Sequence, residues 1–328
     1  MSRYRVLLTG HTFRRTAQAH EAALVAAGCE VIASPYTRPA TEEELIPLVA
    51  DVDAVLASTD HFTRRVFEAA PRLKIVARWG VGFDAIDTEA AADHGIWITT
   101  TPGTNEHSVA DCALTMILAL ARDVVGHVES TRDGQWARQI GSELLDETLG
   151  IIGFGRIGRQ VAMRAAPFGM RILAHDPVMP DDAIRAGGAE PVSLETLMRE
   201  SDYISLHAPS MPETKDLINA RTLAWCKPSA FLVNTARGDL VHEEDLAAAL
   251  RAGTIAGAAL DVFKVEPVAK DSPFRSLPNV LPLPHIAGIT RQSAERMSAA
   301  CVDNILAALR GERPPSPVNA PATPRGHE

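Results

Sequence analysis

The sequence predicts an α/β protein with two domains, each built around a doubly wound parallel sheet. Short β-branched runs alternate with helical patterns through most of the 328 residues, as in parallel sheets covered by helices. A chain of this length exceeds the size at which one hydrophobic core usually stops growing. The alternation also begins a second time near Leu149. We therefore expect two cores, one for each series of elements.

The first series of elements runs from Arg5 to Thr99. Its predicted strands are Arg5–Leu8, Glu30–Ala33, Ala54–Ala57, Lys74–Ala77 and Trp97–Thr99. Helical patterns separate these strands at Ala17–Ala27, after Thr41 and near Thr63–Ala70. Thr41 precedes Glu44 by three residues, which is the spacing of a capping box, so a helix begins at this point.

The second series is preceded by an unusually apolar helix. Ser108–Ala121 is apolar almost all round, which indicates burial either inside a large protein or against a partner subunit. The alternating series then continues from Leu149 to about Leu283, and Ser293–Leu309 follows as an amphipathic helix. The last residues are rich in Pro, Gly and Arg, so we expect this tail to be mostly disordered.

The composition argues against several classes of function. A formal net charge of -9 disfavours non-specific binding to nucleic acid or anionic membranes, because either requires a positive surface. The longest apolar run, Cys112–Ala121, is about half of the roughly 20 residues that span a bilayer, so no transmembrane segment is expected. The N-terminus lacks the long apolar region of a secretory signal, which favours a cytoplasmic protein. The cysteines form no CxxC pair and are interpreted as reduced core residues, and no metal site is expected.

A glycine-rich turn opens the second series. Gly153, Gly155 and Gly158 form a GxGxxG pattern between the apolar run Leu149–Ile152 and a helical stretch. The first glycine permits a tight turn, the second lets the backbone approach a pyrophosphate, and the third packs helix against strand. The N-terminus of the helix adds amide donors and a positive dipole. The pattern predicts a dinucleotide site in a Rossmann-like domain.

An acidic residue after the next strand indicates which dinucleotide binds. The apolar run Arg171–Ala174 leads to Asp176, 18 residues beyond the last glycine of the pattern. A carboxylate at this position accepts hydrogen bonds from ribose hydroxyls and repels a 2′-phosphate, so NAD is favoured over NADP. Arg156 and Ile157 are expected over the pyrophosphate. The alternative is that Asp176 only begins a turn with Pro177.

Three polar residues of the second series have the chemistry of a dehydrogenase site. Each comes at the end of a predicted strand: Arg237 in FLVNTARGDLV, Glu266 in AALDVFKVEP and His285 in VLPLPHIAGIT. Hydride transfer between an alcohol carbon and nicotinamide also moves a proton, which requires an acid/base, and a carboxylate-bearing substrate requires an arginine fork. Taken singly, each residue has an ordinary alternative: a surface ion pair, a solvated carboxylate or a structural histidine.

Together the motifs resemble the D-isomer-specific 2-hydroxyacid dehydrogenase family, which includes D-3-phosphoglycerate, D-lactate, glyoxylate/hydroxypyruvate and formate dehydrogenases. LGIIGFGRIG, NTARG, DVF–EP and PH–AG–T occur in the family's order and spacing, and the similarity extends from about Arg5 to about Leu309. The resemblance implies an NAD-dependent oxidoreductase that transfers a hydride between nicotinamide and C2 of a D-2-hydroxy or 2-keto acid. In that family the residues matching Arg237, His285 and Glu266 bind the substrate carboxylate, act as acid/base, and pair with the acid/base, respectively.

The resemblance also implies further contacts and a domain arrangement. Backbone amides of Gly80, Val81 and Gly82 would hold the substrate carboxylate. The residues expected to line the cofactor cleft are Pro209, Thr235, Asp261 and Gly288, with Asp261 at the nicotinamide amide. The family fold implies a discontinuous substrate domain (1–100 and 290–328), a dinucleotide-binding domain (101–289), and an active-site cleft between them. It also implies a homodimer held through the helix at 108–121.

The identity of the substrate is open at this point. Phosphoglycerate dehydrogenases commonly carry an arginine where this chain has Ala57, and an asparagine where it has Ala85. One phosphate anchor is therefore missing, although Arg78, Arg64 and Arg65 are close enough in sequence to compensate.

We rank a phosphoglycerate dehydrogenase-like activity first, with a glyoxylate/hydroxypyruvate reductase or a generic 2-keto acid reductase as the alternative. Trp79 either shapes a pocket for a smaller acid or is a core aromatic. A different class is an NAD-sensing binding protein, because the family includes corepressors that retain this scaffold. An enzyme would consume NADH with a keto acid, whereas a sensor would bind NADH tightly without consuming it.

Overall fold

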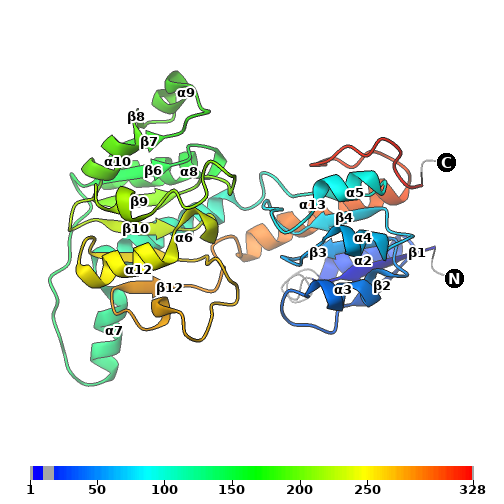
Figure 1. Ribbon diagram of the computed structural model, residues 1–328, viewed down its shortest axis with the longest axis horizontal. Helices are drawn as coiled ribbons and strands as arrows, with labels where there is room; N and C mark the ends of the chain where they lie inside the picture. The colour runs from blue at the N-terminus through cyan, green and yellow to red at the C-terminus, as the bar shows by residue number, and fades with distance from the viewer. Residues whose placement is uncertain (1–2, 10–17, 327–328) are drawn as a thin grey trace. The chain divides into compact units, whose positions relative to one another are not determined.

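The computed structural model describes residues 3–9 and 18–326 of the chain (Figure 1). Internal contacts divide it into two compact units. Unit 1 comprises Met1–Asn105 and Ile289–Glu328, and unit 2 comprises Glu106–Gly288. Each unit contains a parallel sheet covered by helices, which confirms the predicted fold class.

Unit 1 is built on a five-stranded sheet in the order β2-β1-β3-β4-β5. The strands are β1 (Tyr4–Leu8), β2 (Cys29–Ala33), β3 (Ala54–Ala57), β4 (Ile75–Arg78) and β5 (Trp97–Thr99). The helices are α2 (Gln18–Ala26), α3 (Glu42–Val49), α4 (Arg64–Glu68), α5 (Thr88–Asp93) and α13 (Arg291–Leu309). Alternate strand residues face opposite sides, so Val6 and Leu8 pack with α2 and α13, whereas Leu7 packs with α3, α4 and α5.

Two details of unit 1 bear on the predicted helices. The carboxylate of Glu44 accepts the N–H of Thr41 at 2.9 Å, as the capping box requires. Ala17, where the first helix was expected to begin, lies outside the described residues.

Unit 2 is built on a seven-stranded sheet in the order β12-β11-β10-β9-β6-β7-β8. The strands are β6 (Thr148–Ile152), β7 (Arg171–His175), β8 (Glu190–Pro191), β9 (Tyr203–Leu206), β10 (Phe231–Asn234), β11 (Gly257–Leu260) and β12 (Val280–Pro282). One face packs against α6 (Glu106–Ala121), α8 (Arg156–Ala165) and α9 (Asp181–Ala186). The other packs against α10 (Leu194–Glu200), α11 (Ala220–Leu223) and α12 (Glu243–Ala252), while α7 (Val124–Arg132) follows α6.

The apolar helix expected near 108–121 is α6. It packs against α8, β10 and β11, and Ala110, Ala113 and Ile117 lie in the core of unit 2. Burial inside its own unit therefore accounts for much of its apolar character. Neither α6 nor any other helix in the described ranges has the length and apolarity needed to cross a membrane.

The proline-rich C-terminal segment is ordered, so the expectation of a disordered tail is wrong. Pro317 forms an antiparallel bridge with Thr99 on the edge strand β5. The N–H of Val318 donates to the Ile98 carbonyl at 2.8 Å, and the side chain of Asn319 accepts the Ile98 N–H at 2.8 Å. An open strand edge offers backbone partners to a segment without hydrophobic periodicity, and composition gives no sign of this.

Candidate active site

The predicted site residues of unit 2 gather at one edge of its sheet. Its strands are parallel, so their carboxyl ends meet at the same edge. The predicted residues follow these ends: Gly153 after β6, Asp176 after β7, Pro209 after β9, Thr235 and Arg237 after β10, Asp261 and Glu266 after β11, and His285 after β12. The chain order reverses at β6, whose neighbours are β7 and β9. Ligands bind at such a switch point in open α/β sheets.

The three glycines of the GxGxxG turn have different surroundings. Gly153 has a φ of 89°, and a Cβ there would lie 2.6 Å from the backbone nitrogen of Ala208. A Cβ on Gly158 would lie 2.3 Å from the Gly153 carbonyl, so helix α8 packs directly against the turn. Around Gly155, by contrast, no atom of the described residues lies within 4 Å of the Cβ position. This open position at the N-terminus of α8 is where backbone can approach a pyrophosphate.

Asp176 holds the turn after β7 in place. Its Oδ2 accepts the N–H of Phe154 at 2.8 Å, and its Oδ1 accepts those of Val178 and Met179 at 2.9 and 3.0 Å. Burial raises the pKa of Asp176, but these amide donors more than offset burial, and the net pKa lies below the ordinary value. Oδ2 accepts a single N–H from the described residues and so retains capacity for a ribose hydroxyl.

His285 and Glu266 form a close pair. Nδ1 of His285 lies 2.6 Å from Oε2 of Glu266, whose Oε1 accepts the N–H of Phe263 at 3.0 Å. The two side chains are 35% and 30% exposed, so a ligand can reach them. Burial raises the pKa of Glu266, but the hydrogen bond and charge of His285 outweigh burial and the pKa is lowered. The ionised carboxylate keeps the proton on Nδ1, which leaves Nε2 to exchange a proton with a ligand.

Arg237 follows the end of β10, the strand beside β11. Its Nη1 donates to the Ala236 carbonyl at 2.6 Å. The charge of Arg237 contributes to the lowered pKa of Glu266. The three residues that the sequence singled out, Arg237, Glu266 and His285, follow the neighbouring strands β10, β11 and β12 at one edge of the sheet.

Asp261 fixes the turn that carries His285, a role that the sequence did not indicate. Asp261 is fully buried, and its carboxylate accepts the N–H groups of Ile286 and Ala287, both at 2.8 Å. Its carbonyl accepts the N–H of His285 at 2.8 Å. His285 has a φ of 55°, a left-handed conformation that side chains with a Cβ rarely adopt. The three bonds to one buried residue stabilise this conformation.

Two buried polar atoms, Oγ1 of Thr235 and Nδ1 of His207, lie at the same edge without a hydrogen-bond partner among the described residues. Burial lowers the pKa of His207 to about 3, so its ring is neutral. The sequence did not single out His207, which comes just after β9. Of the other predicted cleft residues, Pro209 is exposed and Gly288 is half-buried.

The loop predicted to bind a carboxylate follows β4 in unit 1. The N–H of Gly80 donates to the Arg78 carbonyl at 3.0 Å, and the Gly80 carbonyl accepts the N–H of Thr101 at 2.9 Å. Gly80 has a φ of 139°, a backbone conformation that residues with a Cβ rarely adopt, so this position favours glycine. Within the described ranges, the N–H groups of Val81 and Gly82 donate to no protein acceptor. They are therefore available to an anion.

Trp79 is a core aromatic, which decides between the two interpretations of this residue. It is 4% exposed, packs in the core of unit 1, and donates from Nε1 to Oγ of Ser298 at 3.1 Å. The adjacent loop is thereby tied to α13.

The three arginines considered as phosphate anchors are engaged with protein groups. They bind as follows: Arg64 to Asp93 at 2.7 Å, Arg65 to Glu42, and Arg78 to the Trp79 carbonyl. Ala57 is fully buried at the end of β3 and offers no polar side chain.

Comparison with known proteins agrees with this geometry. Residues 114–287 match the model of the D-isomer specific 2-hydroxyacid dehydrogenase, NAD binding domain. A glyoxylate reductase of Korarchaeum cryptofilum is 42% identical over 86% of this chain and 87% of its own length. A D-3-phosphoglycerate dehydrogenase of Methanocaldococcus jannaschii is 40% identical over 87% of this chain but 55% of its own length. The crystal structure of a glyoxylate reductase from Paecilomyes thermophila, 30% identical, superimposes with a TM-score of 0.83 over 97% of this chain and 99% of that one. The chain therefore belongs to the D-isomer specific 2-hydroxyacid dehydrogenase family and is an NAD-dependent oxidoreductase.

Proposed function

We propose that this protein reduces a small, unphosphorylated 2-keto acid such as glyoxylate or hydroxypyruvate with NADH, and oxidises the D-2-hydroxy acid in reverse. The observation that carries the proposal is the 2.6 Å contact between Nδ1 of His285 and Glu266, with the charge of Arg237 acting on the same carboxylate. An imidazole backed by a carboxylate supplies proton exchange, and a guanidinium supplies carboxylate binding.

The residues around the glycine turn fit NAD. The position above Gly155 is open, and the first N–H groups of α8 have no intrahelical partner. We assign the pyrophosphate to this turn with Arg156 and Ile157, and the adenosine ribose to Asp176. The residues assigned to the nicotinamide half are Pro209, Thr235, Asp261 and Gly288. The unpartnered hydroxyl of Thr235 supports this assignment.

Bound NADH supplies the hydride that C2 of the keto acid receives. Nε2 of His285 donates a proton to the C2 oxygen, and the ionised Glu266 stabilises the imidazolium before the transfer. Arg237 binds the substrate carboxylate with its fork and polarises the C2 oxygen. In unit 1, the free amides of Val81 and Gly82 are assigned to binding an anionic group. In the oxidative direction, the neutral Nε2 accepts the hydroxyl proton.

Two observations favour an unphosphorylated substrate over a phosphoglycerate-type one. Ala57, at the position where an arginine anchor for phosphate was considered, is fully buried and offers no polar side chain. The Korarchaeum relative, which is 42% identical to this chain, is named a glyoxylate reductase.

A panel of keto acids tests the proposal. NADH oxidation is measured with glyoxylate, hydroxypyruvate, 3-phosphohydroxypyruvate and pyruvate, and the substrates are ranked by kcat/KM. We expect glyoxylate or hydroxypyruvate to rank first. A higher value for 3-phosphohydroxypyruvate would contradict the unphosphorylated substrate. Tight NADH binding without turnover of any keto acid would favour an NAD-sensing binding protein instead.

Replacing Asp176 with alanine is expected to affect both cofactor choice and stability. The variant loses the ribose acceptor and the charge that repels a 2′-phosphate, so discrimination against NADPH should relax. It also leaves three backbone N–H groups without their acceptor, at a cost of about 1–3 kcal/mol in the free energy of unfolding. Fluorescence titration with NADH and NADPH, together with thermal unfolding, measures the two effects.

A matched control for this substitution is Asp202→Ala. Asp202 also accepts a backbone N–H, that of Thr148 at 2.9 Å, but it lies at the opposite end of the strands. The control should lose stability without a change in the NADH to NADPH affinity ratio. An unchanged ratio in the Asp176 variant would place the ribose contact elsewhere.

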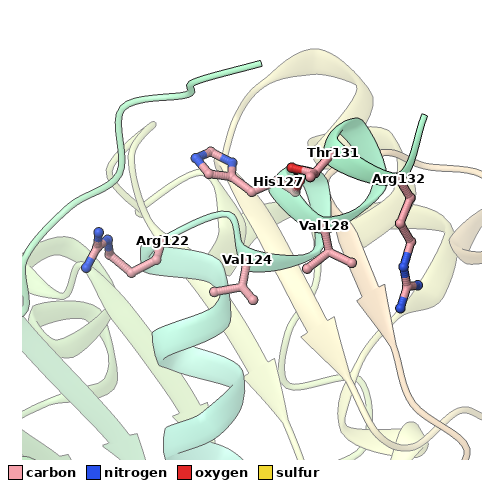
Figure 2. A pocket seen from close by; sticks show the side chains of 6 residues that line it. All are labelled: Arg122, Val124, His127, Val128, Thr131 and Arg132. Carbon is pink, nitrogen blue, oxygen red and sulfur yellow. Dashed lines mark hydrogen bonds between the residues drawn. The ribbon is translucent and has the colours of Figure 1, made fainter. Parts of the chain in front are cut away.

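An exposed apolar surface on α7 and the segment after it supports a homodimer. Val124 and Val128 are 47% and 41% exposed, Trp136 is 69% exposed, and Ile140 is fully exposed. Figure 2 shows Val124, Val128 and Arg132 pointing to one side of α7. These side chains line a hollow of about 730 Å³. Its lining residues are Arg122, Val124, His127, Val128, Thr131 and Arg132. Exposed apolar patches of this kind mark interaction sites. We propose that a second copy of the chain covers this surface, beyond the end of α6.

The double substitution Trp136→Ser with Ile140→Asp is expected to convert a dimer into a monomer. It removes two apolar anchors and places a charge in the interface, which is costly when the charge is buried. Size-exclusion chromatography with light scattering measures the molar mass. Val178→Asp, at an apolar residue that is 84% exposed elsewhere in unit 2, serves as control and should stay dimeric. A monomeric wild type would refute the proposed dimer.

A further inference from the structure

We propose that Asn234 is the positioning residue for Arg237, because its side-chain amide fixes the backbone that carries the guanidinium. The inference rests on the proposed function, in which Arg237 binds the substrate carboxylate. Asn234 is the last residue of β10 and is 1% exposed. A buried primary amide must find hydrogen-bond partners inside the protein, and those partners show what it holds.

The amide of Asn234 bonds to both ends of the dipeptide that follows Thr235. Its Oδ1 accepts the N–H of Ala236 at 3.0 Å, and its Nδ2 donates to the carbonyl of Arg237 at 2.8 Å. Each residue has two soft backbone dihedrals, so all the free rotations of Ala236 and Arg237 lie between the two bonded groups. One planar side chain therefore sets the direction in which the Arg237 side chain leaves the backbone.

The residue after Arg237 is fixed from the opposite side. A Cβ on Gly238 would lie 2.1 Å from the carbonyl carbon of Phe263 and 2.3 Å from the backbone nitrogen of Lys264. The two backbones are thus in direct contact. The N–H of Phe263 in turn donates to Glu266, the partner of His285. Asn234 holds the Arg237 backbone on one side and the Gly238 contact holds it on the other. The position of that backbone is therefore fixed relative to the loop that carries Glu266.

The position of the Arg237 backbone matters for catalysis, because a guanidinium binds a carboxylate through two parallel bonds only when it is correctly placed. A misplacement of about 1 Å at a positioned group can cost about 10²-fold in rate. Asn234→Asp keeps an oxygen for the Ala236 N–H but removes the N–H that reaches the Arg237 carbonyl. It also places a carboxylate against that carbonyl. The turn should loosen, and the guanidinium should lose its fixed direction.

A double-mutant cycle tests this role. Asn234→Asp, Arg237→Lys and the double variant are compared with wild type by kcat and KM for glyoxylate, Kd for NADH and thermal unfolding. The matched control is Asn279→Asp, since the Asn279 side chain also donates to backbone carbonyls in unit 2, those of Leu250 and Ala256 at 3.2 and 3.1 Å.

We expect Asn234→Asp to lower kcat/KM by about 10- to 100-fold while the Kd for NADH stays close to that of the control. In the Arg237→Lys background, Asn234→Asp should lower kcat/KM by less than about threefold. The effects of two residues are not additive when one acts through the other. Asn279→Asp should lower the melting temperature without lowering kcat/KM.

Two outcomes overturn the inference when the wild type turns over a keto acid. The first is a loss of kcat/KM no larger in Asn234→Asp than in Asn279→Asp. The second is a full additional loss in the Arg237→Lys background, because Asn234 would then act independently of Arg237. If Asn234→Asp does not fold, Asn234→Ser, which keeps a hydroxyl acceptor, takes its place in the same cycle. A wild type that turns over no keto acid is a separate case.

In that case the proposed function fails, and the inference is judged by binding alone. Oxalate is titrated into the enzyme with NADH, with NADH fluorescence as the readout. Weakening of oxalate binding by Asn234→Asp in wild type, but not in Arg237→Lys, would support the positioning role. Absence of oxalate binding by the wild type would overturn it.

Discussion

Alanine in place of His285 is expected to lower kcat for keto-acid reduction by about 10² to 10⁴-fold, the typical worth of a positioned acid/base. Nδ1 of His285 is committed to Glu266 at 2.6 Å, so Nε2 is the atom that delivers the proton to the C2 oxygen. Steady-state oxidation of NADH measures kcat. A fluorescence titration should show little change in the Kd for NADH, because the imidazole is assigned to the substrate rather than to the cofactor.

His94→Ala provides the control for the loss of a partly buried imidazole. Nδ1 of His94 lies 2.7 Å from the Ala90 carbonyl at the end of α5, so its removal should affect stability alone. Should His285→Ala retain the wild-type kcat, or lose no more than His94→Ala, His285 has no part in the chemistry.

Lysine in place of Arg237 is expected to lower kcat/KM by about 10- to 150-fold, corresponding to about 1.5–3 kcal/mol for a hydrogen bond to a charged group. Lysine keeps the positive charge, but a point charge cannot reproduce the planar fork that binds a carboxylate through two parallel bonds. The loss should appear mainly in KM if the fork binds substrate and transition state alike, and in kcat if it polarises the C2 oxygen. Initial rates over a range of glyoxylate concentrations separate these contributions.

Arg171→Lys is the matched control in the same unit. Arg171 binds the carboxylates of Glu190 and Glu200 at 2.8 and 2.7 Å on an exposed face. Exchange of guanidinium for ammonium should have little effect there, because exposed ion pairs contribute little to stability. Near wild-type kcat/KM in Arg237→Lys would remove Arg237 from substrate binding.

The sequence predicted the parallel sheets and the convergence of the site because both follow from one rule. Strands that alternate with helices lie parallel, so residues that follow their carboxyl ends gather at one edge. Arg237, Glu266 and His285 could therefore be grouped although they are far apart in the chain. The GxGxxG glycines were predictable for a similar reason, since their steric requirements are local.

The residues that hold the site were beyond prediction because their partners are backbone groups. Asn234 and Asp261 bind N–H and carbonyl groups whose directions depend on turns that have no sequence periodicity. The left-handed backbone of His285 is likewise a result of those contacts rather than of a local preference. For Asp176, the sequence offered ribose binding and turn formation as alternatives. The carboxylate accepts N–H groups of the turn and still has acceptor capacity for a ribose hydroxyl, so the two roles are compatible.

The segment after α13 has a practical consequence for handling the protein. It runs beside β5, and Arg325 fastens it by donating to the carbonyls of Ala70 and Leu73 at 2.6 and 3.1 Å. Truncation after Leu309 would remove this segment. It would expose the backbone N–H and carbonyl groups at the β5 edge of the sheet. Unprotected margins of this kind recruit other chains and promote aggregation. We therefore expect the truncated protein to aggregate more than the full chain, and the proline-rich segment should be kept when the protein is produced.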